Sequence, residues 1–161
     1  MGFSVLFVCT GNICRSPTAE GVMMAKLERE GLAEEVVCDS AGTHGFHVGD
    51  APDAMARQHA LDRGYDLSAL RARKVAPDDF HRFDMILAMD HGHRRLLERQ
   101  APPGTRAKVV MFLDFARHLD VRDVPDPYHG DAADYDYALD LIEAGTDGLL
   151  RALLDGELAQ R

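Results

Sequence analysis

The sequence predicts an α/β fold in which helices cover both faces of a parallel sheet. Short apolar runs typical of buried strands alternate with longer stretches whose apolar residues follow a helical period. The chain has 161 residues, a length that suits a single domain spanning 1–161. It shows no internal repeat, low-complexity tract or linker, and Pro102–Gly104 is interpreted as a loop within that domain.

Two strand–helix units are predicted in the first half of the chain. The mostly apolar run Phe3–Cys9 indicates a strand, and Thr18–Glu30 carries a helical pattern that ends at a glycine. Val36–Ser40 indicates a second, shorter strand, and Asp53–Arg63 indicates a second helix that also ends at a glycine.

The second half of the chain continues this alternation. Met85–Met89 indicates a third strand, His91–Gln100 a helix that ends before two prolines, and Lys108–Met111 a fourth strand. A last helix is predicted from near Asp134 toward Leu158, although two glycines interrupt its middle. Its apolar positions follow a helical period: Leu139, Ile142, Leu149, Leu150, Leu153 and Leu154.

The ends of two predicted strands mark the expected ligand site. In open parallel sheets, ligands bind outside the carboxyl ends of the strands, at a topological switch point. Cys9 ends the first strand, and Asp90 follows the third. We expect Asp90 to cap the helix after it and to lie near the site without taking part in the chemistry.

The segment from Cys9 to Ser16 has the composition of an anion-binding loop (P-loop). It places a thiol, a turn and an arginine just before a helix. Backbone N–H groups in such a turn, together with the helix dipole, favour a bound anion. Gly11 and Asn12 both tolerate the positive φ that a tight turn demands. The loop residues expected to bind the anion are Thr10, Gly11, Asn12, Ile13, Cys14 and Ser16.

Cys9 and Arg15 are the predicted reactive groups of this loop. Helix N-termini and nearby cations stabilise a thiolate, so we expect Cys9 to be ionised and nucleophilic. The planar guanidinium of Arg15 matches two oxygens of a phosphoryl group. Ser16 is the expected N-cap, with Pro17 at the first helical position, and its hydroxyl is expected to support the sulfur. The alternative is a buried strand-end thiol beside a surface arginine.

The segment Val5–Glu20 resembles the N-terminal loop of the low-molecular-weight protein tyrosine phosphatases. The resemblance continues in the family's order through Asp39–Thr43, Phe46–Gly49, Ala88–Asp90 and Asp126–Tyr128. It implies a doubly wound sheet of four parallel strands, of the Rossmann or flavodoxin type. It also implies a protein-tyrosine-phosphatase that forms a phosphocysteine and needs no metal or organic cofactor.

Asp126 is the predicted proton donor. A carboxylic acid positioned beside a phenolic leaving group assists its departure, and two prolines stiffen the backbone around Asp126. The residues alone also allow an ordinary turn aspartate. The family's Asp-Pro-Tyr motif, matched by Asp126–Tyr128, implies a general acid in the first step and a general base in the second.

The resemblance also bears on the substrate. It makes Phe46 and Tyr128 the walls of a cleft deep enough for a phenyl ring, while His129 stands where many relatives carry a second aromatic residue. Ile13 stands where the arginine-phosphatase branch has threonine, and an apolar side chain fits an aromatic phosphomonoester better. The expected substrate is a phosphotyrosine protein or a small aryl phosphate, with inorganic phosphate as a product. A cognate tyrosine kinase is a candidate partner.

Support for the loop is expected from Ser40 and Ser16. Relatives often carry a histidine at the position of Leu70, where it supports the loop through Asn12 and Ser40. Leucine forms no side-chain hydrogen bond, so the support must come from Ser40, water or another side chain.

The other two cysteines have different expected roles. Cys14 lies five residues after Cys9, and a nearby thiol can trap a sulfenic acid as a reversible disulfide. The resemblance implies this redox regulation here, and the alternative is that Cys14 is a small loop filler. Cys38 is expected to be a buried strand thiol.

Composition excludes several classes of partner. The net charge of −9 argues against nucleic acid and against a polybasic membrane anchor. No stretch approaches the roughly 20 apolar residues of a membrane helix, and no basic region precedes the first apolar run, so no membrane insertion or secretory signal is expected. Three cysteines without an even framework favour the reducing cytoplasm.

The remaining charged and metal-ligating residues are expected to lie on the surface. Arg71, Arg73 and Lys74 are interpreted as a solvated segment, and the alternative is a role in receiving an acidic peptide. Two histidine pairs, His44 with His47 and His91 with His93, are interpreted as surface or loop residues. The two cysteines of the loop have a spacing poorly suited to zinc, so no metal site is expected.

Two other functions remain open. A thiol-dependent arsenate reductase uses a similar loop, but relatives of that type need further cysteines downstream, and none follows Cys38. A non-catalytic phosphopeptide-binding module is the second alternative. It is disfavoured because Cys9, Arg15 and Asp126 are all present.

Overall fold

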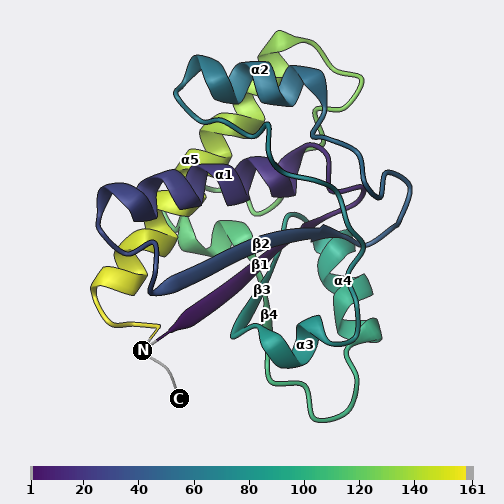
Figure 1. Cartoon of the computed structure of the whole chain (residues 1–161), viewed down its shortest axis with the longest axis vertical. Coiled ribbons are helices and arrows are strands. Elements are labelled where there is room, and N and C mark those ends of the chain that lie inside the picture. The colour runs from purple at the N-terminus through teal and green to yellow at the C-terminus, as the bar shows by residue number, and fades with distance from the viewer. Residues whose placement is uncertain (1, 159–161) are drawn as a thin grey trace.

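Four parallel strands form the centre of the molecule in the computed structural model, which describes residues 2–158 (Figure 1). They lie in the order β2-β1-β3-β4. β1 (Phe3–Cys9) pairs with both β2 (Val36–Gly42) and β3 (Met85–Ala88), and β3 pairs with β4 (Lys108–Met111). The predicted four-stranded parallel sheet is confirmed.

Helices cover both faces of this sheet. α1 (Arg15–Arg29) and α5 (Ala132–Leu154) lie on one face, with α2 (Ala54–Asp62) beside them (Figure 1). The short α3 (Asp79–Arg82) and α4 (His91–Gln100) lie on the other face. The chain leaves β1 toward β2, then returns across β1 to β3. The switch point therefore lies between the ends of β1 and β3, as expected for a doubly wound sheet.

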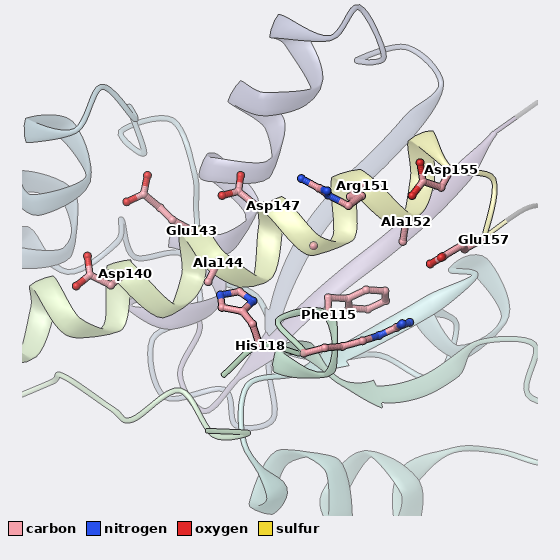
Figure 2. A pocket seen from close by; sticks show the side chains of 12 residues that line it. Phe115, His118, Asp140, Glu143, Ala144, Asp147, Arg151, Ala152, Asp155 and Glu157 are labelled. Atoms are coloured by element: carbon pink, nitrogen blue, oxygen red, sulfur yellow. The ribbon is translucent and has the colours of Figure 1, made fainter. Parts of the chain in front are cut away.

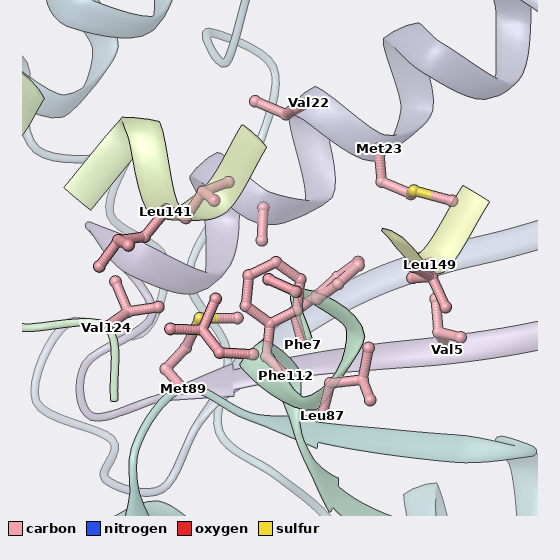
Figure 3. Close-up of a cluster of buried hydrophobic side chains, with 14 of the residues drawn as sticks. Val5, Phe7, Val22, Met23, Leu87, Met89, Phe112, Val124, Leu141 and Leu149 are labelled. Atoms are coloured by element: carbon pink, nitrogen blue, oxygen red, sulfur yellow. The ribbon is translucent and has the colours of Figure 1, made fainter. Parts of the chain in front are cut away.

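The central strand supplies side chains to two separate cores. Val5 and Phe7 of β1 point to the face covered by α1 and α5, where the rings of Phe7 and Phe112 form a T-shaped pair with a centroid distance of 5.7 Å (Figure 3). Leu6 and Val8 point to the opposite face and join the core beneath α3 and α4. This burial of both faces explains why the strand is an apolar run rather than an alternating one.

The start of α1 differs from the prediction. Arg15 is the first helical residue and Cys14 occupies the N-cap position, so the assignment of Ser16 as N-cap and Pro17 as first helical residue is wrong. Cys14 forms no side-chain capping bond, and the Ser16 hydroxyl is engaged elsewhere. Pro17 is still tolerated, because the N–H it lacks would have no partner within the first helical turn.

Two short helices were not predicted, and one long helix begins earlier than expected. α3 and the 3-10 turn η1 (Phe112–Phe115) each span only four residues, too few for a helical period to be visible. α5 begins at Ala132 because Asp131 and Asp134 cap each other's backbone N–H groups. Among the helices of residues 2–158, none has the length and apolar content required to span a membrane.

Two glycines of α5 allow this helix to pack closely on η1. A Cβ added to Gly145 would lie 2.4 Å from the ring of Phe112, and one added to Gly148 would lie 1.8 Å from the backbone oxygen of Phe115. Glycine therefore serves close packing here, although it weakens the helix itself.

We predict that Gly148→Ala destabilises the protein, although the same change in an open helix stabilises it by up to about 1 kcal/mol. The added methyl group meets backbone, so we expect a loss of about 1–3 kcal/mol in the free energy of unfolding, measured in urea. Ala133→Gly, at an exposed position of the same helix, is the control and should cost no more than about 1 kcal/mol. A more stable Gly148→Ala protein would contradict the packing argument.

Candidate active site

The loop that connects β1 to α1 is held by its carbonyl groups. The N–H groups of Thr43 and His44 donate to the carbonyls of Cys9 and Thr10, at 2.8 and 3.0 Å, and a third bond joins Asp53 to Ile13. Within the described part of the chain, the backbone N–H groups of residues 11–14 donate to no protein acceptor. The loop therefore has free amide donors at a helix N-terminus, which is the arrangement that binds an anion.

The end of β2 approaches this loop too closely for any side chain. A Cβ added to Gly42 would lie 2.6 Å from the carbonyl oxygen of Thr10, a backbone contact that cannot give way cheaply. Glycine at this position is thus required by the proximity of two main-chain segments.

Asn12 fixes the shape of the loop. Its backbone has φ of 59°, the left-handed conformation expected from the sequence, and its side chain is buried. The side-chain oxygen accepts a hydrogen bond from the N–H of Arg73 at 2.9 Å. The amide nitrogen donates to the hydroxyls of Ser16 at 2.8 Å and Ser40 at 2.9 Å. All three bonds together orient the amide in one way only.

Cys9 lies at the base of the loop with its sulfur beside a hydroxyl. Its Sγ is 3.0 Å from the Oγ of Ser16, which confirms the expected contact between the two side chains. Ser16 Oγ accepts a hydrogen bond from Asn12, and its single proton can be donated to the sulfur or to the carbonyl of Ala41, 3.4 Å away.

Arg15 is buried and connects four parts of the site. Its Nη1 donates to Asp90 Oδ2 and to the carbonyl of Val124, both at 3.0 Å. Its Nη2 lies 3.4 Å from Thr10 Oγ1 and 3.7 Å from Asp126 Oδ2. Burial opposes ionisation of Asp90, but the backbone N–H of His93 and the Arg15 charge more than offset it, so the Asp90 pKa lies below its ordinary value. Asp90 also caps α4, as predicted.

Asp126 reaches the site on the segment that follows β4 and η1. The N–H of Tyr128 donates to its Oδ1 at 3.1 Å, and the N–H of Val124 anchors the segment to the carbonyl of Met89 at 2.8 Å. The Asp126 side chain is about half exposed, which leaves its carboxyl accessible from the cleft.

A cleft of about 200 Å³ brings most of the predicted site residues together. Asn12 and Ser16 do not line it, although both were predicted to contact the anion; their buried side chains brace the loop from behind. His47 lines the cleft and was not predicted to do so: its ring packs against Gly11, where an added Cβ would lie 2.9 Å from it. The lining residues are Cys9, Thr10, Gly11, Ile13, Cys14, Arg15, Phe46, His47, Asp126 and Tyr128.

A larger hollow of about 800 Å³ lies elsewhere, between α5 and the segment that follows η1 (Figure 2). Its walls carry carboxylates such as Asp155 and Glu157 together with Arg151 and His118. None of the predicted site residues lines it, whereas Cys9 and Cys14 both line the smaller cleft.

His93 is a supporting residue that the sequence analysis placed wrongly on the surface. The ring is buried, its Nε2 is 2.8 Å from Thr10 Oγ1, and its Nδ1 is 3.2 Å from Asp90 Oδ1. Burial, reinforced by the Arg15 charge, lowers the His93 pKa to about 4. The only signal in the sequence was its position three residues after the capping Asp90.

The support that Leu70 does not supply comes from Ser40, Glu20 and Arg73. Ser40 Oγ donates to Glu20 Oε1 at 2.6 Å, and burial raises the Glu20 pKa to about 7. Arg73 is not part of a solvated segment, because its guanidinium pairs with Asp39 and Asp79 and its N–H holds Asn12. Neither Glu20 nor Arg73 was predicted to support the loop.

All three cysteines are free thiols. Burial, followed by the charge of Asp53, raises the pKa of Cys14, so this thiol stays protonated at neutral pH. Cys38 lies in β2 and is partly exposed, while burial of its sulfur raises the pKa to about 12.

The comparisons with known proteins agree with this geometry. A family model described as low molecular weight phosphotyrosine protein phosphatase matches residues 4–159. A low molecular weight protein-tyrosine-phosphatase of Streptomyces coelicolor is 43% identical over 156 residues, 95% of this chain and 94% of the relative. A protein tyrosine phosphatase of Entamoeba histolytica, crystallised with Hepes in the active site, superposes with a TM-score of 0.91 at 36% identity, covering 97% of this chain and 99% of that one. An arginine phosphatase of Drosophila superposes with a TM-score of 0.87 at 28% identity, covering 92% and 96%.

We predict that Glu20→Gln stabilises the fold at pH 8. The Glu20 pKa is raised from 4.5 to about 7 on folding, so the folded state loses stability as the pH rises through this interval. A neutral glutamine avoids that loss, which amounts to at most about 3 kcal/mol. Urea unfolding at pH 4 and pH 8 should show a gain confined to pH 8, and an equal effect at both values would contradict the assignment.

Proposed function

The chain belongs to the low molecular weight phosphotyrosine protein phosphatase family and is a protein-tyrosine-phosphatase, and we propose that Cys9, Arg15 and Asp126 carry out its reaction. The observation that supports these roles best is that the three side chains line one cleft at the switch point of the sheet. We also propose that residues 1–161 form one phosphatase domain.

In the first step, Cys9 Sγ attacks phosphorus in line with the tyrosine oxygen. The S–P bond forms while the P–O bond to tyrosine breaks, and Asp126 gives its proton to the departing phenolate. The free N–H groups of the loop and the guanidinium of Arg15 hold the three remaining phosphoryl oxygens. Stabilisation of a phosphoryl transition state depends mainly on such positioning and charge.

In the second step, water attacks the phosphocysteine. Asp126, now a carboxylate, takes a proton from this water, the S–P bond breaks, and inorganic phosphate leaves. The Ser16 hydroxyl, 3.0 Å from Cys9 Sγ, supports the sulfur as it leaves with its electron pair. No metal or organic cofactor takes part in either step as written.

The cleft favours an aromatic phosphomonoester, although the fold is shared with an arginine phosphatase. Ile13 adds an apolar side chain to its lining, and the rings of Phe46 and Tyr128 line it as well. Both rings are well exposed and so are available to a phenyl group. We propose phosphotyrosine proteins as substrates, with small aryl phosphates as substitutes.

Two further assignments extend this proposal. A cognate tyrosine kinase is the expected source of the substrate. A reducing compartment, the cytoplasm, suits an enzyme whose three cysteines are all free thiols and whose nucleophile is one of them.

We further propose that Cys14 protects Cys9 from irreversible oxidation. Both thiols line the same cleft, and oxidation of Cys9 by a peroxide gives a sulfenic acid that a neighbouring thiol converts to a disulfide with release of water. A thiol reductant then restores both cysteines.

We predict that Asp126→Ala slows the enzyme most on substrates with poor leaving groups. A phenyl phosphate, whose leaving group has a pKa near 10, should lose about 100-fold or more in kcat, and an activated nitrophenyl phosphate much less. Cys9→Ser should abolish turnover of both substrates. Equal slowing of the two substrates by Asp126→Ala would contradict the acid role.

We predict that Cys14→Ser makes peroxide inactivation irreversible. Wild-type enzyme treated with hydrogen peroxide should regain most of its activity with dithiothreitol, whereas the variant should regain little, because its sulfenic acid is oxidised further. Cys38→Ser is the matched control and should recover like the wild type. If Cys14→Ser regained its activity as the wild type does, the Cys14 thiol would have no protective role and would only occupy space in the loop.

A further inference from the structure

Three basic residues lie close together on the segment that follows α2, and only one of them keeps its charge free. The guanidinium of Arg71 folds back and donates to two carbonyls of its own turn. The guanidinium of Arg73 is held by two aspartates. Lys74 is exposed, and its ammonium group forms no ion pair or hydrogen bond with any residue in the described range 2–158.

The backbone directs the Lys74 side chain toward the active-site cleft. Lys74 forms a parallel bridge with Gly42 at the end of β2. On either side of it, Gly42 N–H donates to the carbonyl of Arg73 at 2.8 Å, and Val75 N–H donates to the carbonyl of Gly42 at 2.9 Å. Successive side chains of an extended segment point to opposite sides, so Lys74 points away from the aspartates that hold Arg73. Its stem packs against Gly45, where an added Cβ would lie 3.7 Å from Lys74 Cδ.

Gly45 lies between two rings at the wall of the cleft. Phe46 lines the cleft and is 72% exposed, and His44 stacks on it with a centroid distance of 5.0 Å. The N–H of His44 donates to the carbonyl of Thr10 at 3.0 Å, which ties this wall to the loop. Lys74 does not line the cleft itself. Its charge therefore lies beside the Phe46 wall, where residues next to a bound phosphotyrosine would pass.

The opposite wall of the cleft carries the opposite charge. Tyr128 lies on the segment that also holds the exposed carboxylates of Asp126 and Asp131. On the side of Lys74, the carboxylate of Asp50 is occupied by the ring of His47 at 3.3 Å. The net charge of −9 does not cancel this local difference, because exposed charges are largely screened beyond about 8 Å at physiological ionic strength.

We propose that Lys74 is a specificity-determining residue that binds an acidic side chain next to the phosphotyrosine of a protein substrate. The proposal rests on the proposed function, because that function places the phosphotyrosine in the cleft. The flexible four-carbon stem of lysine allows its ammonium group to follow a mobile partner. An exposed ion pair is weak, so Lys74 selects among phosphotyrosine sites by a few-fold and leaves the chemical step unchanged.

The test compares kcat/KM for phosphotyrosine peptides at low ionic strength. The peptides carry glutamate, glutamine or lysine in the two positions before the phosphotyrosine or in the two positions after it, with all other residues neutral. In at least one of these two series, the wild-type enzyme should prefer glutamate over glutamine by about two- to fivefold, and lysine should be poorest. This preference should disappear in about 0.5 M NaCl. No preference, or a preference for lysine in both series, would overturn the proposal.

A charge reversal makes the result specific to one side chain. Lys74→Glu should reverse the preference, so that the lysine peptide becomes the better substrate, and Lys74→Gln should abolish it. Lys108→Glu is the matched control, because it changes the net charge equally at an exposed position where β4 begins, away from the carboxyl ends of the strands. It should keep the wild-type preference. An equal change in both glutamate variants would show an effect of net charge and would overturn the proposal.

Failure of this proposal is distinguishable from failure of the proposed reaction. Nitrophenyl phosphate has no flanking residues, so Lys74→Glu should turn it over within about twofold of the wild type. A larger loss would show that Lys74 supports the cleft itself and would overturn its role in selection. Turnover of peptides by Cys9→Ser would refute the proposed reaction. An inactive Cys9→Ser protein combined with an unchanged peptide preference in Lys74→Glu would refute the role of Lys74 alone.

Discussion

The side-chain amide of Asn12 is the interaction on which the rest of the site depends. Its three hydrogen bonds tie the loop to three other segments: to Arg73 on the segment that follows α2, to Ser40 in β2 and to Ser16 in α1. These bonds hold a left-handed backbone that a non-glycine residue adopts only at some cost. Without them, the free N–H groups of the loop would have no fixed direction.

The features that the sequence predicted are those set by neighbouring residues. β1 was predicted to its exact bounds because an apolar run of this length has few other structures available. The positive φ of Asn12 and the capping role of Asp90 also follow from local chemistry. The loop, its nucleophile and its arginine form one continuous segment, so their proximity needed no knowledge of the fold.

The features that the sequence did not predict depend on contacts between distant segments. Glu20 meets Ser40 only because β2 lies beside β1, and His93 meets Thr10 only because the ends of β1 and β3 are adjacent. Arg73 has the composition of a surface residue until Asp39 and Asp79 are placed around it. The first turn of α1 was misplaced for a related reason: Ser16 has the side chain of a cap, but Asn12 and Cys9 engage it instead.

Arg15 lies between the carboxyl groups of Asp90 and Asp126, and this arrangement affects both the binding of the phosphoryl group and the release of phosphate. Asp90 binds one nitrogen of its guanidinium and Asp126 lies near the other, so the side-chain charges around the cleft do not sum to a strong positive field. Capture of a dianion must then come largely from main-chain dipoles. The orthophosphate left after hydrolysis faces the sulfur that has just left with its electron pair, and this repulsion favours escape of the product over product inhibition.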